Sequence, residues 1–155
     1  MPKIQFITLE TQEMPKEVLE RDFPELGPLP IRGGWGYDLE TACIIEQPDD
    51  LDIPFDGVGV EYVFAEHRIY EELMFVRGPG QRYEDVSIQR LRQRLIGEGD
   101  RYYDVLTLQV SARPVKPTAP VGNANKSRHA PLHTGECEFW FDITSFFGKF
   151  VFDED

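Results

Sequence analysis

Residues 136–144, ECEFWFDIT, alternate so regularly that they predict a β-strand with one apolar face. Phe139 and Phe141 fall on one side of such a strand, whereas Trp140 and its acidic neighbours fall on the other. A second stretch, YDVLTLQVS at 103–111, is rich in aliphatic and β-branched residues and also predicts a strand. These two stretches carry the clearest secondary-structure signal in the chain.

Weaker patterns on the N-terminal side predict further strands and helices. Alternating residues at 3–8 and 41–46 indicate two more strands. The segment 57–76 favours a helix, because it is too long for an ordinary strand; a strand at its start is the alternative. Residues 84–96 predict another helix, since their aliphatic residues share one helical face and Gly97 follows where a helix would end.

The order of these elements predicts an α+β fold. Residues 14–22 indicate an additional short helix, with Pro in its first turn. We therefore expect a mainly antiparallel sheet of about four or five strands with two principal helices, because strands and helices are grouped rather than strictly alternating. The length of 155 residues fits a single globular domain over 1–155. Residues 112–135 predict a long loop, and residues 153–155 a frayed acidic tail.

The chain is strongly acidic, and its charge is unevenly distributed. The net charge is −12, and residues 1–60 hold 13 acidic against 4 basic side chains. Residues 101–135 reverse this balance, with 5 basic side chains and 1 acidic one, and residues 136–155 are acidic again. A net negative field opposes general binding to phosphate backbones and to anionic lipid surfaces. The charge therefore favours a basic protein partner and argues against nucleic acid as a ligand.

The sequence shows no feature of a membrane or secreted protein. It has no apolar run near its start that resembles a signal peptide, and no window of 18 apolar residues. We expect no membrane association and a cytoplasmic location. Cys43 and Cys137 are then expected to remain free thiols, because disulfides are rare in reducing compartments.

The glycine-rich segment 31–37, IRGGWGY, predicts a tight turn around Trp35. One interpretation is a structural turn that places Trp35 in the core. Another is a turn that presents Trp35 and Tyr37 to a partner, since aromatic residues often anchor protein interfaces. A phosphate-binding loop is the weakest interpretation, because no Gly-Lys-Ser/Thr follows the glycines.

A second group of candidate binding residues comes from an arginine-rich and tyrosine-rich segment. Arg77, Arg82, Arg101 and Tyr103 belong to it, and such a composition is typical of nucleic-acid surfaces. Interspersed acidic residues cancel most of its positive charge, so we interpret the segment as a solvated surface with local ion pairs.

No metal site or cofactor is expected. His129, His133 and Cys137 are four residues apart and would share one face of a helix, as a zinc site requires. Pro131 and Gly135 interrupt this segment, so a continuous helix is not expected there.

The function that we expect is a non-enzymatic interaction module for a basic partner, by analogy with small acidic inhibitors and immunity proteins. Cys43 and His67 are a candidate nucleophile and base, but no third residue that would orient them can be named. The alternative is an anion-binding or small-molecule-binding domain, or an enzyme. Its site would lie where the turn at 31–37, the segment 77–103 and the loop at 112–135 meet.

Overall fold

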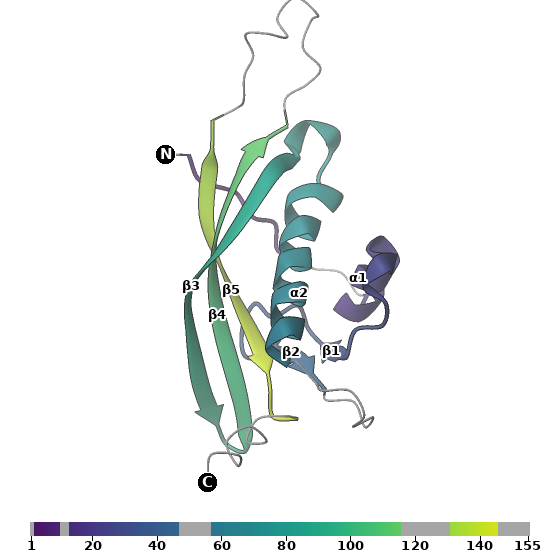
Figure 1. Cartoon of the computed structure of the whole chain (residues 1–155), viewed down its shortest axis with the longest axis vertical. Helices are drawn as coiled ribbons and strands as arrows, with labels where there is room; N and C mark the ends of the chain where they lie inside the picture. The colour runs from purple at the N-terminus through teal and green to yellow at the C-terminus, as the bar shows by residue number, and fades with distance from the viewer. Residues whose placement is uncertain (1, 10–12, 47–56, 116–130, 146–155) are drawn as a thin grey trace, which may run out of the picture.

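The structure is a computed structural model that describes residues 2–9, 13–46, 57–115 and 131–145. Within these residues the sheet has five strands: Ile31–Gly33 (β1), Cys43–Ile45 (β2), Tyr83–Glu98 (β3), Arg101–Pro114 (β4) and His133–Asp142 (β5). They lie in the order β1-β2-β5-β4-β3 (Figure 1). All neighbouring strands are antiparallel except β2 and β5, which are parallel. The predicted mainly antiparallel α+β arrangement is confirmed.

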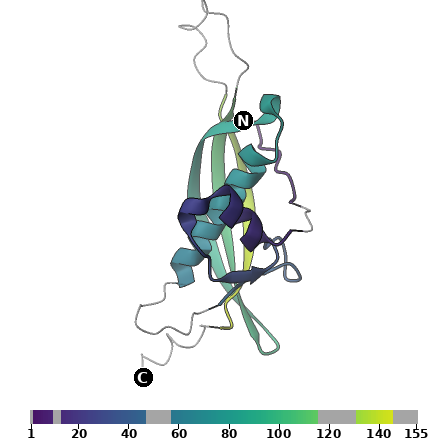
Figure 2. The same ribbon diagram turned by 90° about the vertical axis from the view of Figure 1, so that its right-hand side faces the viewer.

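The helices lie on one side of this sheet. They are Pro15–Asp22 (α1), the 3-10 turns Pro24–Leu26 (η1) and Pro79–Gln81 (η3), and Gly57–Tyr70 (α2), which continues as a π-helical turn, Glu71–Phe75 (η2). Two views show α2 packed between the long strands and α1 (Figures 1 and 2). The helices predicted at 14–22 and 57–76 are confirmed. No helix within the described ranges is long and apolar enough to cross a bilayer.

The helix predicted at 84–96 is wrong, because this segment forms most of β3. It pairs with β4 along nearly its whole length, with a bulge between Arg90 and Arg92. Gly97 lies inside the strand opposite Tyr102 rather than ending a helix, and Gly99 adopts the left-handed conformation that the hairpin turn requires. Most of β3 is exposed on both faces, so its aliphatic residues do not follow a buried stripe. The backbone of β3 instead pairs with the N–H and C=O groups along the edge of β4.

The strand predicted at 3–8 is also wrong. Only Lys3 forms an isolated bridge, to Thr134 near the start of β5. Beyond it the backbone finds side-chain partners instead, and the guanidinium of Arg77 donates to the carbonyl of Gln5. A strand needs a continuous ladder of backbone partners, which this segment does not have.

The ends of the loop predicted at 112–135 belong to strands. β4 continues to Pro114 and β5 begins at His133, so both strands are longer at this end than their apolar patterns predict. Residues 116–130 and the predicted tail at 153–155 lie outside the described residues.

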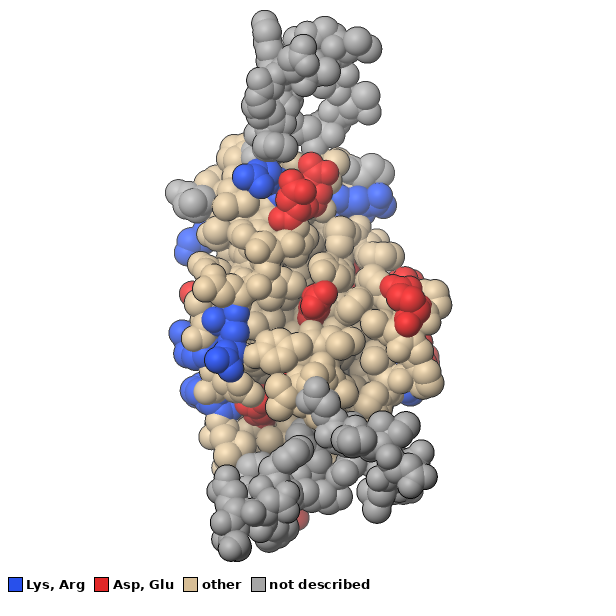
Figure 3. All heavy atoms as spheres, in the orientation of Figure 1, with Lys and Arg blue, Asp and Glu red and all other residues tan. Residues whose placement is uncertain are grey.

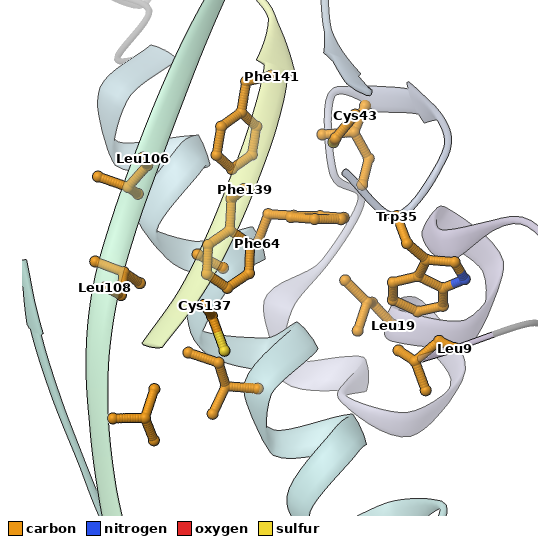
Figure 4. Packing of buried hydrophobic residues seen from close by; sticks show 14 of the residues in the cluster. Leu9, Leu19, Trp35, Cys43, Phe64, Leu106, Leu108, Cys137, Phe139 and Phe141 are labelled. Carbon is orange, nitrogen blue, oxygen red and sulfur yellow. The ribbon is translucent and has the colours of Figure 1, made fainter. Parts of the chain in front are cut away.

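The core lies between α2 and the sheet. Phe64 from α2 meets Phe141 of β5 edge-to-face, with ring centroids 5.7 Å apart, and Phe139 follows on the same side of β5. Leu106 and Leu108 of β4 extend this layer (Figure 4). Phe139 and Phe141 therefore occupy the buried face that the alternation of residues 136–144 predicts.

A buried ion pair joins two residues one turn apart at the end of α2. The side chains of Arg68 and Glu72 are 2% and 1% exposed, and Arg68 Nε lies 3.0 Å from Glu72 Oε2. The hydroxyl of Tyr37 donates to the same carboxylate oxygen over 2.7 Å. Burial raises the pKa of Glu72, whereas Arg68 and Tyr37 oppose this rise by stabilising the ionised carboxylate.

The same guanidinium connects α2 to the turn and to β5. Arg68 donates to the carbonyl of Trp35 over 3.0 Å and to the carbonyl of Glu138 over 3.3 Å. Its planar group lies over the rings of Tyr37 and Phe139, 4.1 and 3.8 Å from their centroids. Three segments that are distant in sequence therefore meet at one charged side chain.

We predict that Arg68→Ala lowers the free energy of unfolding by about 3–5 kcal/mol, because truncation leaves the Glu72 carboxylate buried without its cation. Urea denaturation followed by circular dichroism measures this change. The matched control is Arg32→Ala, which removes an exposed ion pair with Glu46 and should change stability by less than about 1 kcal/mol. Equal effects of the two substitutions would contradict the role given to Arg68.

Candidate functional site

The turn between β1 and β2 is held by a dense set of hydrogen bonds. Thr41 Oγ1 accepts from the backbone N–H groups of Tyr37 and Asp38, and Asp38 Oδ1 accepts from both the N–H and the hydroxyl of Thr41. Gly36 adopts a φ of +87°, and its carbonyl accepts from the N–H of Trp140 over 2.8 Å. The turn is therefore a preformed structure fastened to β5.

A hollow of about 560 Å³, here called the outer pocket, lies beside this turn. Its walls come from the N-terminal segment, the start of α1 and the turn: Thr8, Leu9, Glu13, Met14, Pro15, Gly33, Gly34, Trp35, Tyr37, Asp38, Glu40 and Thr41. Three of these residues carry carboxylates, Glu13, Asp38 and Glu40, and none is Lys or Arg. The outer pocket therefore has an apolar interior with an acidic border.

A smaller hollow of about 300 Å³, here called the inner pocket, adjoins the outer one. It is lined by Ile7, Thr8, Leu9, Glu13, Val18, Arg21, Trp35, Glu71 and Val76. Four of these residues also line the outer pocket, namely Thr8, Leu9, Glu13 and Trp35. The two hollows thus share a wall.

Trp35 forms part of that shared wall. Its side chain is 6% exposed and packs near Phe64, with ring centroids 6.2 Å apart. Figure 4 shows the nitrogen edge of the indole turned away from the phenyl rings of β5 and toward α1. The indole Nε1 is buried and has no hydrogen-bond partner among the described residues. This donor is an exception to the rule that buried polar groups are paired.

Glu71 is the second buried polar residue of the inner pocket. It begins the π-helical turn that ends α2, and such turns occur frequently at functional sites. Burial and the neighbouring carboxyl of Asp22 raise the pKa of Glu71 to about 8. No N–H or O–H group of the described residues donates to Glu71 Oε1.

Tyr37 positions the N-terminal wall of both pockets. Its hydroxyl accepts from the N–H of Leu9 over 2.9 Å while it donates to Glu72. Burial is the main reason that the pKa of the Tyr37 hydroxyl is raised far above its usual value. The phenol thus acts here as a neutral hydrogen-bonding link between the N-terminal segment and α2.

The structure brings two of the predicted site residues together and separates the others. Trp35 and Tyr37 line the same pocket, although Trp35 lies in the core rather than projecting from the turn. Arg82 precedes β3 and Arg101 follows it, so a strand of about 50 Å separates them. Arg77 is buried and donates to three carbonyl groups, including that of Glu72.

The remaining predicted residues have structural partners of their own. Arg101 binds Asp142 through two nitrogens, at 3.0 and 2.7 Å, near the β3–β4 turn. Tyr103 lies on the outer face of the sheet, with its ring 6.3 Å from that of Trp140. The arginines of the segment 77–103 therefore do not converge on one anion site with the glycine-rich turn.

Basic side chains are concentrated along one margin of the molecule. On the face in Figure 3, many Lys and Arg side chains lie along the margin formed by β3 and β4, whereas acidic side chains lie in separate groups, one of them over α1. The acidic border of the outer pocket belongs to the α1 side, because Glu13 and Met14 lead directly into that helix.

The described residues do not provide the geometry of a metal site or of a cysteine nucleophile. His133 and Cys137 lie on one strand about 13 Å apart, too far to share an ion. No group of three potential metal ligands occurs in the described ranges, which exclude His129. Burial raises the pKa of both thiols, to about 12 for Cys137 and well above the usual value for Cys43. Protonated thiols are poor nucleophiles.

Glu13, Glu40 and Glu71 are site residues that the sequence did not single out. The acidity of residues 1–60 was a signal for the first two, but it did not show which carboxylates border a pocket. Glu71 lies beside Glu72 on α2, where spacing alone does not reveal that both are buried. The inner pocket forms only because the end of α2 packs against α1 and the turn.

Glu71 predicts a pH-dependent stability. Its folded-state pKa of about 8 exceeds the usual glutamate pKa of 4.5, so its contribution to stability is fully present below pH 4.5 and is lost as pH rises through 8. Between pH 4.5 and 8, we expect the free energy of unfolding of Glu71→Gln to fall less steeply with pH than that of the wild type, by up to about 1.4 kcal/mol per pH unit. Urea denaturation across this range measures the slope. The exposed Glu17→Gln control should keep the wild-type slope, and an unchanged slope in Glu71→Gln would disprove the assignment.

Comparison with protein-family models, with curated proteins and with solved structures finds no match to this chain. The functional interpretation of the two pockets therefore rests on their geometry and chemistry.

Proposed function

We propose that this protein is a non-enzymatic interaction module that binds a basic protein partner at the outer pocket. The observation that carries this proposal is the composition of the pocket border, which has three carboxylates and no cationic side chain. A Lys or Arg side chain of the partner supplies the missing positive charge. We propose the cytoplasm as its compartment, because the two thiols would stay reduced there.

The three carboxylates differ in how freely they can bind such a cation. Glu40 is exposed and forms no hydrogen bond or ion pair with the described residues. Asp38 uses one oxygen to hold Thr41, and Glu13 is partly neutralised by Arg21 at 2.7 Å. Glu40 and the second oxygen of Asp38 are therefore the main contacts that we propose for the partner's cation.

The apolar interior of the pocket suits the rest of a basic side chain. Lys and Arg carry aliphatic stems that pack on apolar surface while their charged ends reach polar groups. Leu9, Met14 and Pro15 provide such a surface in the lining of the pocket. The pocket thus combines a place for the stem with a place for the charge.

The net charge adds long-range attraction to this local site. With a net charge of −12, the protein attracts a basic partner during diffusion, and the association rate should fall as salt screens the field. The preformed turn limits the entropy lost on binding, because its backbone is already fixed by Thr41 and Asp38.

We predict that a fluorescein-labelled hexa-arginine peptide binds the protein and that Asp38→Asn/Glu40→Gln weakens this binding at least about tenfold, which equals about 1.4 kcal/mol. Fluorescence anisotropy at low and at physiological salt measures both effects. The Asn retains an oxygen for Thr41, so the turn should remain intact.

The matched control is Glu84→Gln/Glu98→Gln, which removes the same charge from β3 on the opposite side of the molecule. This variant should bind within about twofold of the wild type, because only the long-range attraction changes. Equal weakening by the two double variants would show that overall charge, and not the outer pocket, binds the peptide.

A further inference from the structure

We infer that the inner pocket binds a neutral carboxamide group. The site goes beyond the proposed contact with a basic side chain, because it uses other groups in a separate hollow. Two observations carry it: a pocket of about 300 Å³, and one buried polar atom without a hydrogen-bond partner on each of two residues that line it. Such a volume lies at the lower end of the range for small-ligand sites.

The unpaired atoms are of opposite kinds. Trp35 Nε1 carries a hydrogen and can only donate, whereas Glu71 Oε1 can accept. A carboxamide offers both complements, since its carbonyl accepts and its NH₂ group donates. An ammonium group would leave the indole without an acceptor. The pairing of one donor with one acceptor therefore favours an amide over an amine.

The charges around the pocket favour a neutral ligand. Arg21 lines the pocket, but its guanidinium is already engaged by Glu13 at 2.7 Å and by Asp22 at 3.2 Å. A carboxylate ligand would come close to these two acidic residues, which repel it. An amide satisfies both unpaired atoms without adding charge to a partly dehydrated site.

The apolar walls define the rest of the ligand. Ile7, Leu9, Val18 and Val76 line the same pocket as the polar pair, so they favour a short branched aliphatic group attached to the amide. A free small amide and the Asn or Gln side chain of a protein partner present the same chemistry. The second source rests on the proposed function, whereas the first does not.

The test is a titration of the ¹⁵N-labelled protein with isovaleramide, followed through the indole N–H signals of its two tryptophans. Trp35→Phe assigns the signals by deleting one of them. We expect a saturable shift of the Trp35 signal with a dissociation constant of about 1–10 mM, as suits so small a ligand, and no shift of Trp140. Isovalerate and isoamylamine, which have the same aliphatic group, should bind at least about tenfold more weakly.

Two variants test whether the Glu71 side chain accepts a hydrogen bond from the amide. Glu71→Gln keeps a side-chain carbonyl and should retain isovaleramide binding, whereas Glu71→Leu removes the acceptor and should abolish it. The dispersed amide spectrum shows that each variant is folded. The inference is overturned if the Trp35 signal does not shift in the wild type, which means that water alone occupies the pocket. It is also overturned if all three probes shift the signal equally, which means that the aliphatic group and not the amide is bound.

A second arm distinguishes the two sources of the amide. The peptide acetyl-Arg-Gln-Arg-amide is compared with acetyl-Arg-Ala-Arg-amide under the same conditions. A Trp35 shift that is specific to the glutamine peptide assigns the site to a partner's side chain, and a shift with isovaleramide alone assigns it to a free ligand. The isovaleramide result does not depend on basic peptides, so failure of the proposed function and failure of this inference are distinguishable.

Discussion

A buried guanidinium is the constraint on which the rest of this structure depends. Arg68 is almost completely removed from water, and a charge in that position is tolerated only when a counter-ion and acceptors surround it. Glu72 supplies the counter-ion, while the backbones of the turn and of β5 supply carbonyl oxygens. Because these partners come from three distant segments, α2, the turn and β5 have to assemble together.

This assembly also creates the two pockets. The contact of Arg68 with the carbonyl of Trp35 holds the indole between them, and the hydroxyl of Tyr37 holds Leu9 on the opposite wall. The π-helical turn then directs Glu71 toward α1, where it meets Asp22. The candidate site is therefore a consequence of the same polar network that fixes the core. Its acidic border faces solvent and its inner wall is largely dehydrated, so the two parts suit different ligand groups.

Local sequence patterns predicted β4 and β5 from strong signals, and α1 and α2 from weaker ones. Residues 136–144 alternate strictly, and the segment 57–76 is too long and uninterrupted to be a strand. The segment 84–96 was predicted incorrectly because nearly all of it is exposed, and an exposed strand carries no burial pattern to distinguish it from a helix. For the segment at 3–8 the alternation was present, but its backbone found side-chain partners instead of a neighbouring strand.

The amino-acid sequence by itself determined the fold class, the acidity and the turn around Trp35, because alternation, charge and glycine spacing are local properties. Tertiary structure alone decided that Trp35 is buried, that Arg68 and Glu72 pair in the core, and that Glu13, Asp38 and Glu40 border one pocket. It also separated Arg82 from Arg101 by the length of β3. The physical reason is that burial and charge pairing depend on contacts between distant segments, which local periodicity does not encode.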